Sequence, residues 1–183
     1  MPSPNYMFSQ KDINEKMRAI LVDWIIEVHL KFKLLPETLF ITINLIDRYL
    51  SLVSIKRNNL QLVGVTAMFI ASKYEQIQTP EVRDFVYITD NAYTKNEIFA
   101  MEHAILSTLN FSMIMCTPYR FLERFFKVAS DSQRVWNLAR YLIELPLIEH
   151  RMLKYTPSIL AASAVYLAQN ILLGNQSEWT TDL

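Results

Sequence analysis

The side chains that most often perform catalysis are thinly spread in this sequence. Its three histidines, His29, His103 and His150, lie far apart, and none has the His-x-x-x-His spacing of a metal site. Only two glycines are present, Gly64 and Gly174, so the sequence contains no glycine-rich loop that could hold a phosphate group. A catalytic triad assembled from distant residues stays open, but no residue pattern favours one. We therefore expect a protein that binds other molecules, without a metal or a cofactor, rather than an enzyme.

The segment 17–33 has the pattern of a helix with two apolar stripes. The first stripe contains Met17, Ile20, Leu21, Trp24 and Val28, with the carboxylate of Glu27 beside it. The second stripe contains Val22, Ile25, Ile26, His29 and Phe32. Because a peripheral helix needs only one apolar stripe, the pattern indicates either a helix buried on all sides or an apolar surface left for a partner. It does not choose between the two.

Arg18 lies in the middle of the second apolar stripe. A buried guanidinium needs a carboxylate partner, because its desolvation alone costs several kcal/mol. Asp47 is flanked by apolar residues and is the expected partner. The alternative is that the arginine side chain extends to solvent. In either case this pair would be structural rather than catalytic.

Composition narrows the class of protein. Hydrophobic residues make up 51% of the 183 positions, and the scarcity of glycine argues against an all-β fold with many turns. Lysine plus arginine and aspartate plus glutamate both number 18, so net charge gives no reason to expect nucleic acid or an anionic membrane as a partner. The single cysteine, Cys116, allows no internal disulfide and suits a reducing compartment. The longest apolar stretch, 159–173, is shorter than the roughly 20 residues that span a bilayer.

Helix-start signals organise the chain as an all-α protein. A threonine precedes a proline at Thr79, Thr117 and Thr156, which predicts a capped helix start at each step. Capping-box spacing occurs at Thr94 with Glu97 and at Ser130 with Gln133, Pro36 opens another helix, and Gly174 ends one. The predicted helices lie near 17–33, 37–52, 58–73, 80–87, 94–107, 118–129, 132–149 and 157–173.

An internal repeat divides these helices into two groups. Residues 64–71 and 161–168 share small side chains at the same helical positions and an aromatic residue near the end. Each copy is therefore interpreted as the centre of a bundle, although two unrelated alanine-rich helices would look the same. The expected organisation is an N-terminal segment (1–16) with a shortened helix, a first bundle of five helices (17–109), a linker (110–117) and a second, C-terminally incomplete bundle (118–183).

Several motifs occur in the order of the cyclin box. Residues 17–24 read MRAILVDW, 46–50 read IDRYL, 71–75 read ASKYE and 87–90 read YITD, and in this the chain resembles the cyclins. Residues 27–29 (EVH) and 31–34 (KFKL) look more like mitotic B-type cyclins than A-type cyclins. Residues 152–155 and 160–162 are similar to the family's second cyclin fold. The resemblance implies two tandem cyclin folds in a non-catalytic subunit that binds and allosterically activates a cyclin-dependent protein kinase during G2/M control. It also implies a location in the nucleus and the cytoplasm.

The resemblance assigns two sets of binding residues. The residues that match the family's docking patch for Arg-x-Leu substrates are Met17, Ile20, Leu21, Trp24, Glu27, Leu60 and Gln61. Those that match its kinase-binding surface are Lys73, Tyr74, Glu75, Ile77, Glu102, Leu106 and Phe111. Gln76 stands where the family usually has a glutamate, which puts an ion pair there in doubt. The rival interpretation is a cyclin-fold adaptor, as in transcription factors of the IIB kind or pocket proteins, which binds DNA or peptides without activating a kinase.

Overall fold

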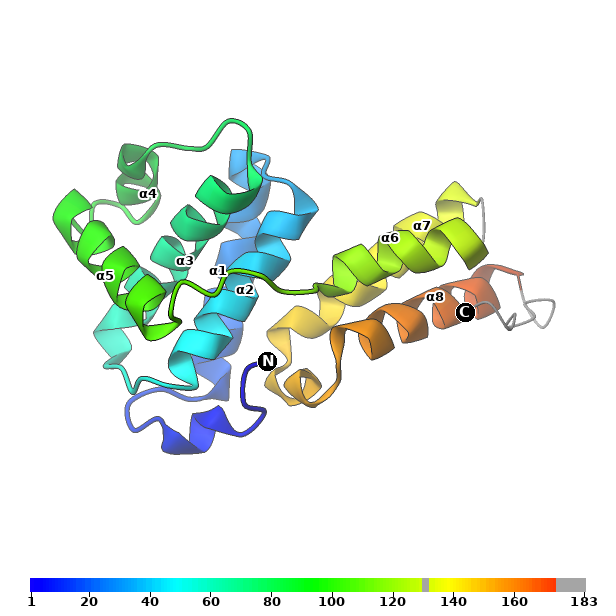
Figure 1. Ribbon diagram of the computed structural model, residues 1–183, viewed down its shortest axis with the longest axis horizontal. Helices are drawn as coiled ribbons and strands as arrows, with labels where there is room; N and C mark the ends of the chain where they lie inside the picture. The colour runs from blue at the N-terminus through cyan, green and yellow to red at the C-terminus, as the bar shows by residue number, and fades with distance from the viewer. Residues whose placement is uncertain (130–131, 174–183) are drawn as a thin grey trace. The chain divides into compact units, whose positions relative to one another are not determined.

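The structure is a computed structural model that describes residues 1–129 and 132–173. Over these residues it contains helices and no strand, which confirms the all-α prediction (Figure 1). The α-helices are α1 (Glu15–Phe32), α2 (Pro36–Leu50), α3 (Leu60–Glu75), α4 (Val82–Ile88), α5 (Lys95–Thr108), α6 (Pro118–Ala129), α7 (Gln133–Glu144) and α8 (Pro157–Leu173). Short 3-10 helices lie at Tyr6–Ser9, Arg57–Asn59, Leu145–Ile148 and His150–Lys154.

The chain forms two compact units. The first contains Met1–Ile114 together with Ile148–Leu153, and the second contains Met115–Leu147 and the chain from Lys154 onward. The division expected from the sequence placed 148–153 in the second bundle, whereas this short segment packs within the first unit. The N-terminal segment, where a shortened helix was expected, forms only the 3-10 turn Tyr6–Ser9 before α1 begins.

Helix α3 is the centre of the first unit. It packs against α1, α2, α4 and α5, and every residue from 62 to 72 is buried (Figure 1). Gly64 permits the close approach of α1, because a Cβ atom at this position would lie 2.7 Å from Cδ1 of Leu21. The packing confirms that residues 64–71 are the core of a bundle.

The buried amide of Gln10 fastens the N-terminal segment to the end of α2. Its Nε2 atom donates hydrogen bonds of 2.7 Å to the carbonyl oxygens of Leu50 and Val53. Its Oε1 atom accepts a hydrogen bond of 3.1 Å from the backbone N–H of Ile55. These three bonds satisfy backbone groups that the end of α2 leaves without helical partners.

Four of the predicted helix starts are confirmed. The hydroxyls of Thr117 and Thr156 accept hydrogen bonds from backbone N–H groups three residues later, at 3.3 and 3.4 Å. Thr94 forms the predicted capping box with Glu97 at the start of α5. Pro36 is the first residue of α2, as predicted.

Two other predictions of helix boundaries were wrong. Thr79 does not cap α4, because Glu81 is the N-cap residue and its backbone N–H donates to Oδ2 of Asp84 at 2.8 Å. The helix predicted over 132–149 ends at Glu144 and continues as a 3-10 turn, since Pro146 lacks the N–H that another α-helical turn requires. The capping box predicted from Ser130 and the helix end predicted at Gly174 lie outside the described residues.

In the second unit, α8 packs against α6 and α7. The side of α8 that faces these helices carries the small buried residues Ala161, Ala164, Val165 and Ala168. Its other side exposes Ile159, Tyr166, Leu167 and Ile171. None of the helices in the described part of the chain is long and apolar enough to cross a membrane.

Candidate partner-binding surfaces

A buried ion pair fixes the orientation of α1. Nε of Arg18 donates to Oδ1 of Asp47 and Nη2 donates to Oδ2, both at 2.7 Å, and the two side chains are each 1% exposed. The predicted pairing of α1 with α2 is therefore confirmed. Because Arg18 faces α2, Met17 and Ile20, which lie about 100° or more away around the helix, are directed away from this contact.

Two further segments contact the ion pair, and the sequence pattern did not reveal either of them. The hydroxyl of Tyr6 donates to Oδ1 of Asp47 at 2.8 Å, and Nη1 of Arg18 donates to the carbonyl oxygen of Ile148 at 3.3 Å. The ring of His150 meets the ring of Tyr6 edge to face, with centroids 4.9 Å apart. Tyr6, Arg18, Asp47 and His150, here named the anchor cluster, join segments that are far apart in the sequence.

The anchor cluster shifts the pKa values of two of its members. Burial and the neighbouring carboxylate of Asp47 both raise the pKa of the Tyr6 hydroxyl, because the phenolate would be desolvated and repelled. Burial alone would lower the pKa of Arg18, but the adjacent charge and hydrogen bonds of Asp47 outweigh it and raise the pKa. Arg18 therefore stays cationic and Tyr6 neutral, which is the state that the hydrogen bonds require.

Part of the first apolar stripe of α1 reaches the surface, here named the α1 patch, whereas Val28 of that stripe is only 2% exposed. Ile20 is 62% exposed and Glu27 is exposed, while Met17, Trp24 and Gln61 are half-buried. Leu21 was predicted to face outward, and this was wrong, since it is only 6% exposed and packs against Gly64. Leu60 is equally buried, at 6%. Leu21 and Leu60 therefore lie beneath the α1 patch, and the other five predicted residues reach its surface.

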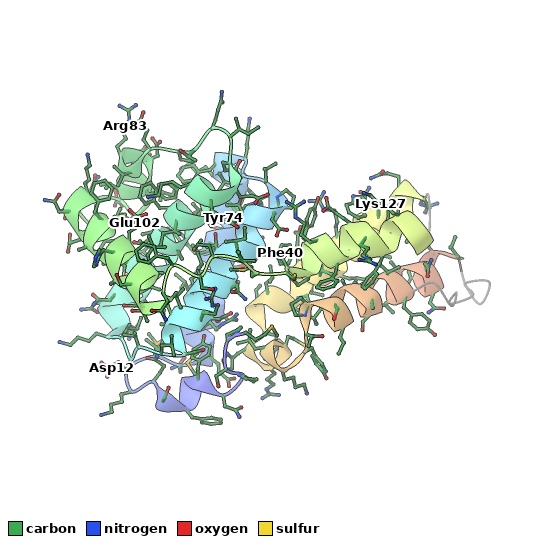
Figure 2. All side chains as sticks on the ribbon, viewed as in Figure 1. Asp12, Phe40, Tyr74, Arg83, Glu102 and Lys127 are labelled. Carbon is green, nitrogen blue, oxygen red and sulfur yellow. The ribbon has the colours of Figure 1, made fainter. Side chains whose placement is uncertain are left out.

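A second exposed surface lies at the end of α3 and along the C-terminal half of α5. Lys73 on α3 forms an ion pair with Glu102 on α5, and its Nζ atom lies 4.1 Å from the centre of the Phe69 ring. Figure 2 labels Glu102 on α5 and Tyr74 at the end of the neighbouring α3. The exposed fractions of Tyr74 and Ile77 are 52% and 101%. Such exposure of large apolar side chains next to a fixed charge pair is typical of a binding surface.

The end of α5 contributes the remaining residues of this second surface. The large apolar side chain of Phe111 is 65% exposed, and Leu106 is half-buried. The φ angle of Phe111 is 53°, in the left-handed region that residues other than glycine seldom adopt. A hydrogen bond of 2.8 Å from its N–H to the carbonyl oxygen of Leu106 holds this conformation. With Lys73, Tyr74, Glu75, Ile77 and Glu102, these residues are named the α3–α5 surface.

Gln76 points inward rather than toward a partner. It is half-buried, and its Nε2 atom donates a hydrogen bond of 2.6 Å to the hydroxyl oxygen of Thr38 on α2. The glutamine is therefore used to tie the end of α3 to α2. Within residues 1–129 and 132–173, no group of three or more histidine, cysteine, aspartate or glutamate side chains could hold a metal ion.

Comparisons with known proteins cover both halves of the chain. Residues 1–114 match the family model described as "Cyclin, N-terminal domain", and residues 116–183 match "Cyclin, C-terminal domain". Among curated proteins, Cyclin-B2-1 of Oryza sativa subsp. japonica is 55% identical over 97% of this chain and 42% of its own length. G2/mitotic-specific cyclin-1 of Medicago sativa subsp. varia is 51% identical over 98% of this chain and 43% of its own length.

A solved structure has the same fold. The X-ray structure of a viral cyclin from herpesvirus saimiri matches with a TM-score of 0.82 and 20% identity, over 93% of this chain and 75% of that one. The chain spans about two fifths of the length of the curated relatives that it matches. With both family models matched and two curated cyclins more than 50% identical, this chain belongs to the cyclin family.

Proposed function

We propose that this chain is the part of a mitotic cyclin that binds and activates a cyclin-dependent protein kinase, and that it performs no chemistry itself. The observation that carries the proposal is the Lys73–Glu102 ion pair, which joins the last turn of α3 to the middle of α5 on a surface that also exposes Tyr74, Ile77 and Phe111. A fixed pair of charges supplies both a hydrogen-bond donor and an acceptor, and the apolar residues supply area to bury. The name "G2/mitotic-specific cyclin" of one relative supports the assignment to cell division.

The proposed mechanism is a shift of the kinase between two conformations. The kinase is active when its C-helix is turned inward, because a glutamate of that helix then pairs with the catalytic lysine. A cyclin that binds the inward conformation more tightly increases its population, and the difference in affinity limits the size of the shift. Because the α3-centred core and the Gln76–Thr38 hydrogen bond hold the α3–α5 surface in place without the kinase, little conformational entropy would be lost on binding.

Substitution of Lys73 tests this proposal. Lys73→Ala should weaken kinase binding by about 2 kcal/mol, which corresponds to about thirtyfold, since it removes the cation and leaves Glu102 at the interface without its partner. The matched control is Lys95→Ala at the start of α5, where the lysine also lies over a phenylalanine ring, at 5.3 Å from the centre of Phe99. Binding is measured by titration with a purified cyclin-dependent kinase, and activation is measured as histone phosphorylation. Equal effects of the two substitutions, or no stimulation by the unsubstituted chain, would contradict the proposal.

We further propose that the α1 patch recruits substrates that contain Arg-x-Leu. The apolar side chains of Met17, Ile20 and Trp24 would contact the leucine of the peptide, and the exposed carboxylate of Glu27 would pair with its arginine. Trp24→Ala should weaken binding of an Arg-x-Leu peptide by about 1–3 kcal/mol and leave the affinity for the kinase unchanged. If both affinities fell equally, the role of Trp24 would be in the core, and the patch would not be a separate docking site.

The location in the nucleus and the cytoplasm remains part of the proposal. A cyclin that activates a mitotic kinase needs access to substrates in both compartments. Fluorescence microscopy of the tagged protein through a synchronised division tests this, and exclusion from the nucleus at every stage would contradict it. The rival cyclin-fold adaptors would bind DNA or peptides without stimulating any kinase, so the histone assay separates them from the proposed function.

A further inference from the structure

The three threonine–proline steps of this chain do not have the same environment. The hydroxyl of Thr117 caps α6 and the residue is 2% exposed, and the hydroxyl of Thr156 caps α8. Thr79 is exposed and lies two residues before the N-cap of α4. No residue in the described part of the chain forms a hydrogen bond with the hydroxyl of Thr79. One of three identical dipeptides thus leaves its hydroxyl free.

The backbone around Thr79 lies outside any helix or strand. No helix or strand is present between Gln76 and Glu81, whose ψ angles of 143° and 157° are both extended. The ring of a proline disfavours the α conformation for the residue before it, so Pro80 helps to keep Thr79 extended. Ile77, two residues away, is fully exposed. An exposed, extended threonine followed by proline is what a proline-directed protein kinase requires of its substrate.

We propose that Thr79 is a phosphorylation site for a proline-directed protein kinase, and that its phosphate weakens binding at the α3–α5 surface. In the transfer, the Thr79 hydroxyl oxygen forms a bond to the γ-phosphorus of ATP as the bond from that phosphorus to the β–γ bridging oxygen breaks. ADP leaves with the electron pair of the broken bond, and the hydroxyl proton passes to a base of the modifying kinase. The products are ADP and phosphothreonine at position 79.

The charges near Thr79 explain the effect expected of the phosphate. The group adds about 1.5 to 2 negative charges at neutral pH, on a segment that already carries Glu75, Glu81 and Asp84. The two cations nearest to Thr79 in the sequence are already paired, since Lys73 pairs with Glu102 and Arg83 pairs with Glu81 at 2.9 Å. A partner that covers Ile77 would have to desolvate this added charge without a cation to neutralise it. This second half of the inference rests on the proposed function of the α3–α5 surface.

Phosphate mapping by mass spectrometry tests the first half. The full chain is incubated with Mg²⁺, ATP and a purified proline-directed serine/threonine kinase that is not the proposed partner. Thr79 should be modified about fivefold faster or more than Thr117 and Thr156, because those hydroxyls must first leave their helix caps. Pro80→Ala, which keeps the hydroxyl, should abolish the modification. Equal rates at the three threonines, absence of phosphate on Thr79, or unchanged modification of the Pro80→Ala variant would overturn this half.

A binding titration tests the second half. The phosphorylated chain should bind a purified cyclin-dependent kinase about tenfold more weakly than the unmodified chain, and Thr79→Ala should bind as the unmodified chain does. Equal affinity of the phosphorylated and unmodified chains would overturn the regulatory role and leave the modification site standing. If the unmodified chain failed to bind the kinase, the proposed function would fail instead, and the phosphate map would still decide whether Thr79 is a site.

Discussion

Loss of one member of the Arg18–Asp47 pair should be among the most damaging single substitutions in the first unit. Arg18→Met keeps much of the apolar volume but leaves the carboxylate of Asp47 buried, with the Tyr6 hydroxyl as a remaining donor. An isolated buried charge is costly, and removal of one partner from a buried pair typically costs about 3–5 kcal/mol. The first unit should therefore lose about that much stability.

Removal of both charges should be much less harmful than the two single losses suggest. In the variant with Arg18→Met, Asp47→Leu and Tyr6→Phe, no buried charge or unpaired hydroxyl remains in the anchor cluster. Replacement of a buried pair by apolar residues of similar volume is often nearly neutral. The costs of the substitutions should thus be strongly non-additive, with a favourable coupling energy of about 2 kcal/mol or more.

Hydrogen exchange is the appropriate assay, because a chain of two units need not unfold in one step. Exchange of the slowest amides in α1 and α2 reports the free energy of opening of the first unit alone. Denaturant unfolding of each variant then checks the order of stabilities. If Arg18→Met and Asp47→Leu each cost less than about 1 kcal/mol, or if their costs simply add, the geometry of the pair does not control stability and the reasoning fails.

Two further predictions concern Tyr6 and Gly64. Since the pKa of Tyr6 lies above its ordinary value of 10.0, the folded chain keeps a proton that the unfolded chain releases. The free energy of unfolding should therefore fall above about pH 10 by about 1.4 kcal/mol per pH unit, and Tyr6→Phe should remove this part of the slope; an unchanged slope would contradict it. Gly64→Ala should destabilise the first unit by about 1–2 kcal/mol because its Cβ would meet Leu21. In a chain that carries Leu21→Ala, the same substitution should instead stabilise by about 0.5–1 kcal/mol, and chemical unfolding of the four chains checks both signs.

Most helices and the buried pair could be predicted from the sequence because their causes are local. Prolines and capping residues mark helix starts within one turn. An arginine inside an apolar stripe requires a carboxylate partner, whichever helix supplies it. Asp47 could be found because it is also surrounded by apolar residues in its own helix. The packing of Ile148–Leu153 within the first unit could not be predicted, since it depends on contacts between segments more than 100 residues apart.

The candidate sites could be predicted less completely, and Leu21 shows why. Helical periodicity places Leu21 with Met17 and Trp24 on one stripe, but it does not show how closely the next helix approaches. Gly64 allows α3 to come so near that Leu21 is covered, while Ile20, one position earlier, stays exposed. The direction of a side chain follows from the pattern of its own helix, whereas its burial also depends on the side chains of the neighbouring helix.

The repeated helices α3 and α8 show the same distinction on a larger scale. Phe69 of α3 aligns with Tyr166 of α8, yet Phe69 is 6% exposed and Tyr166 is 50% exposed. Phe69 meets the rings of Phe85 on α4 and Phe99 on α5, at 5.3 and 6.2 Å between centroids, whereas α8 packs mainly on α6 and α7. A repeat in the sequence thus predicts which helix can serve as the centre of a bundle. How much of that helix is buried depends on the number of helices that pack around it.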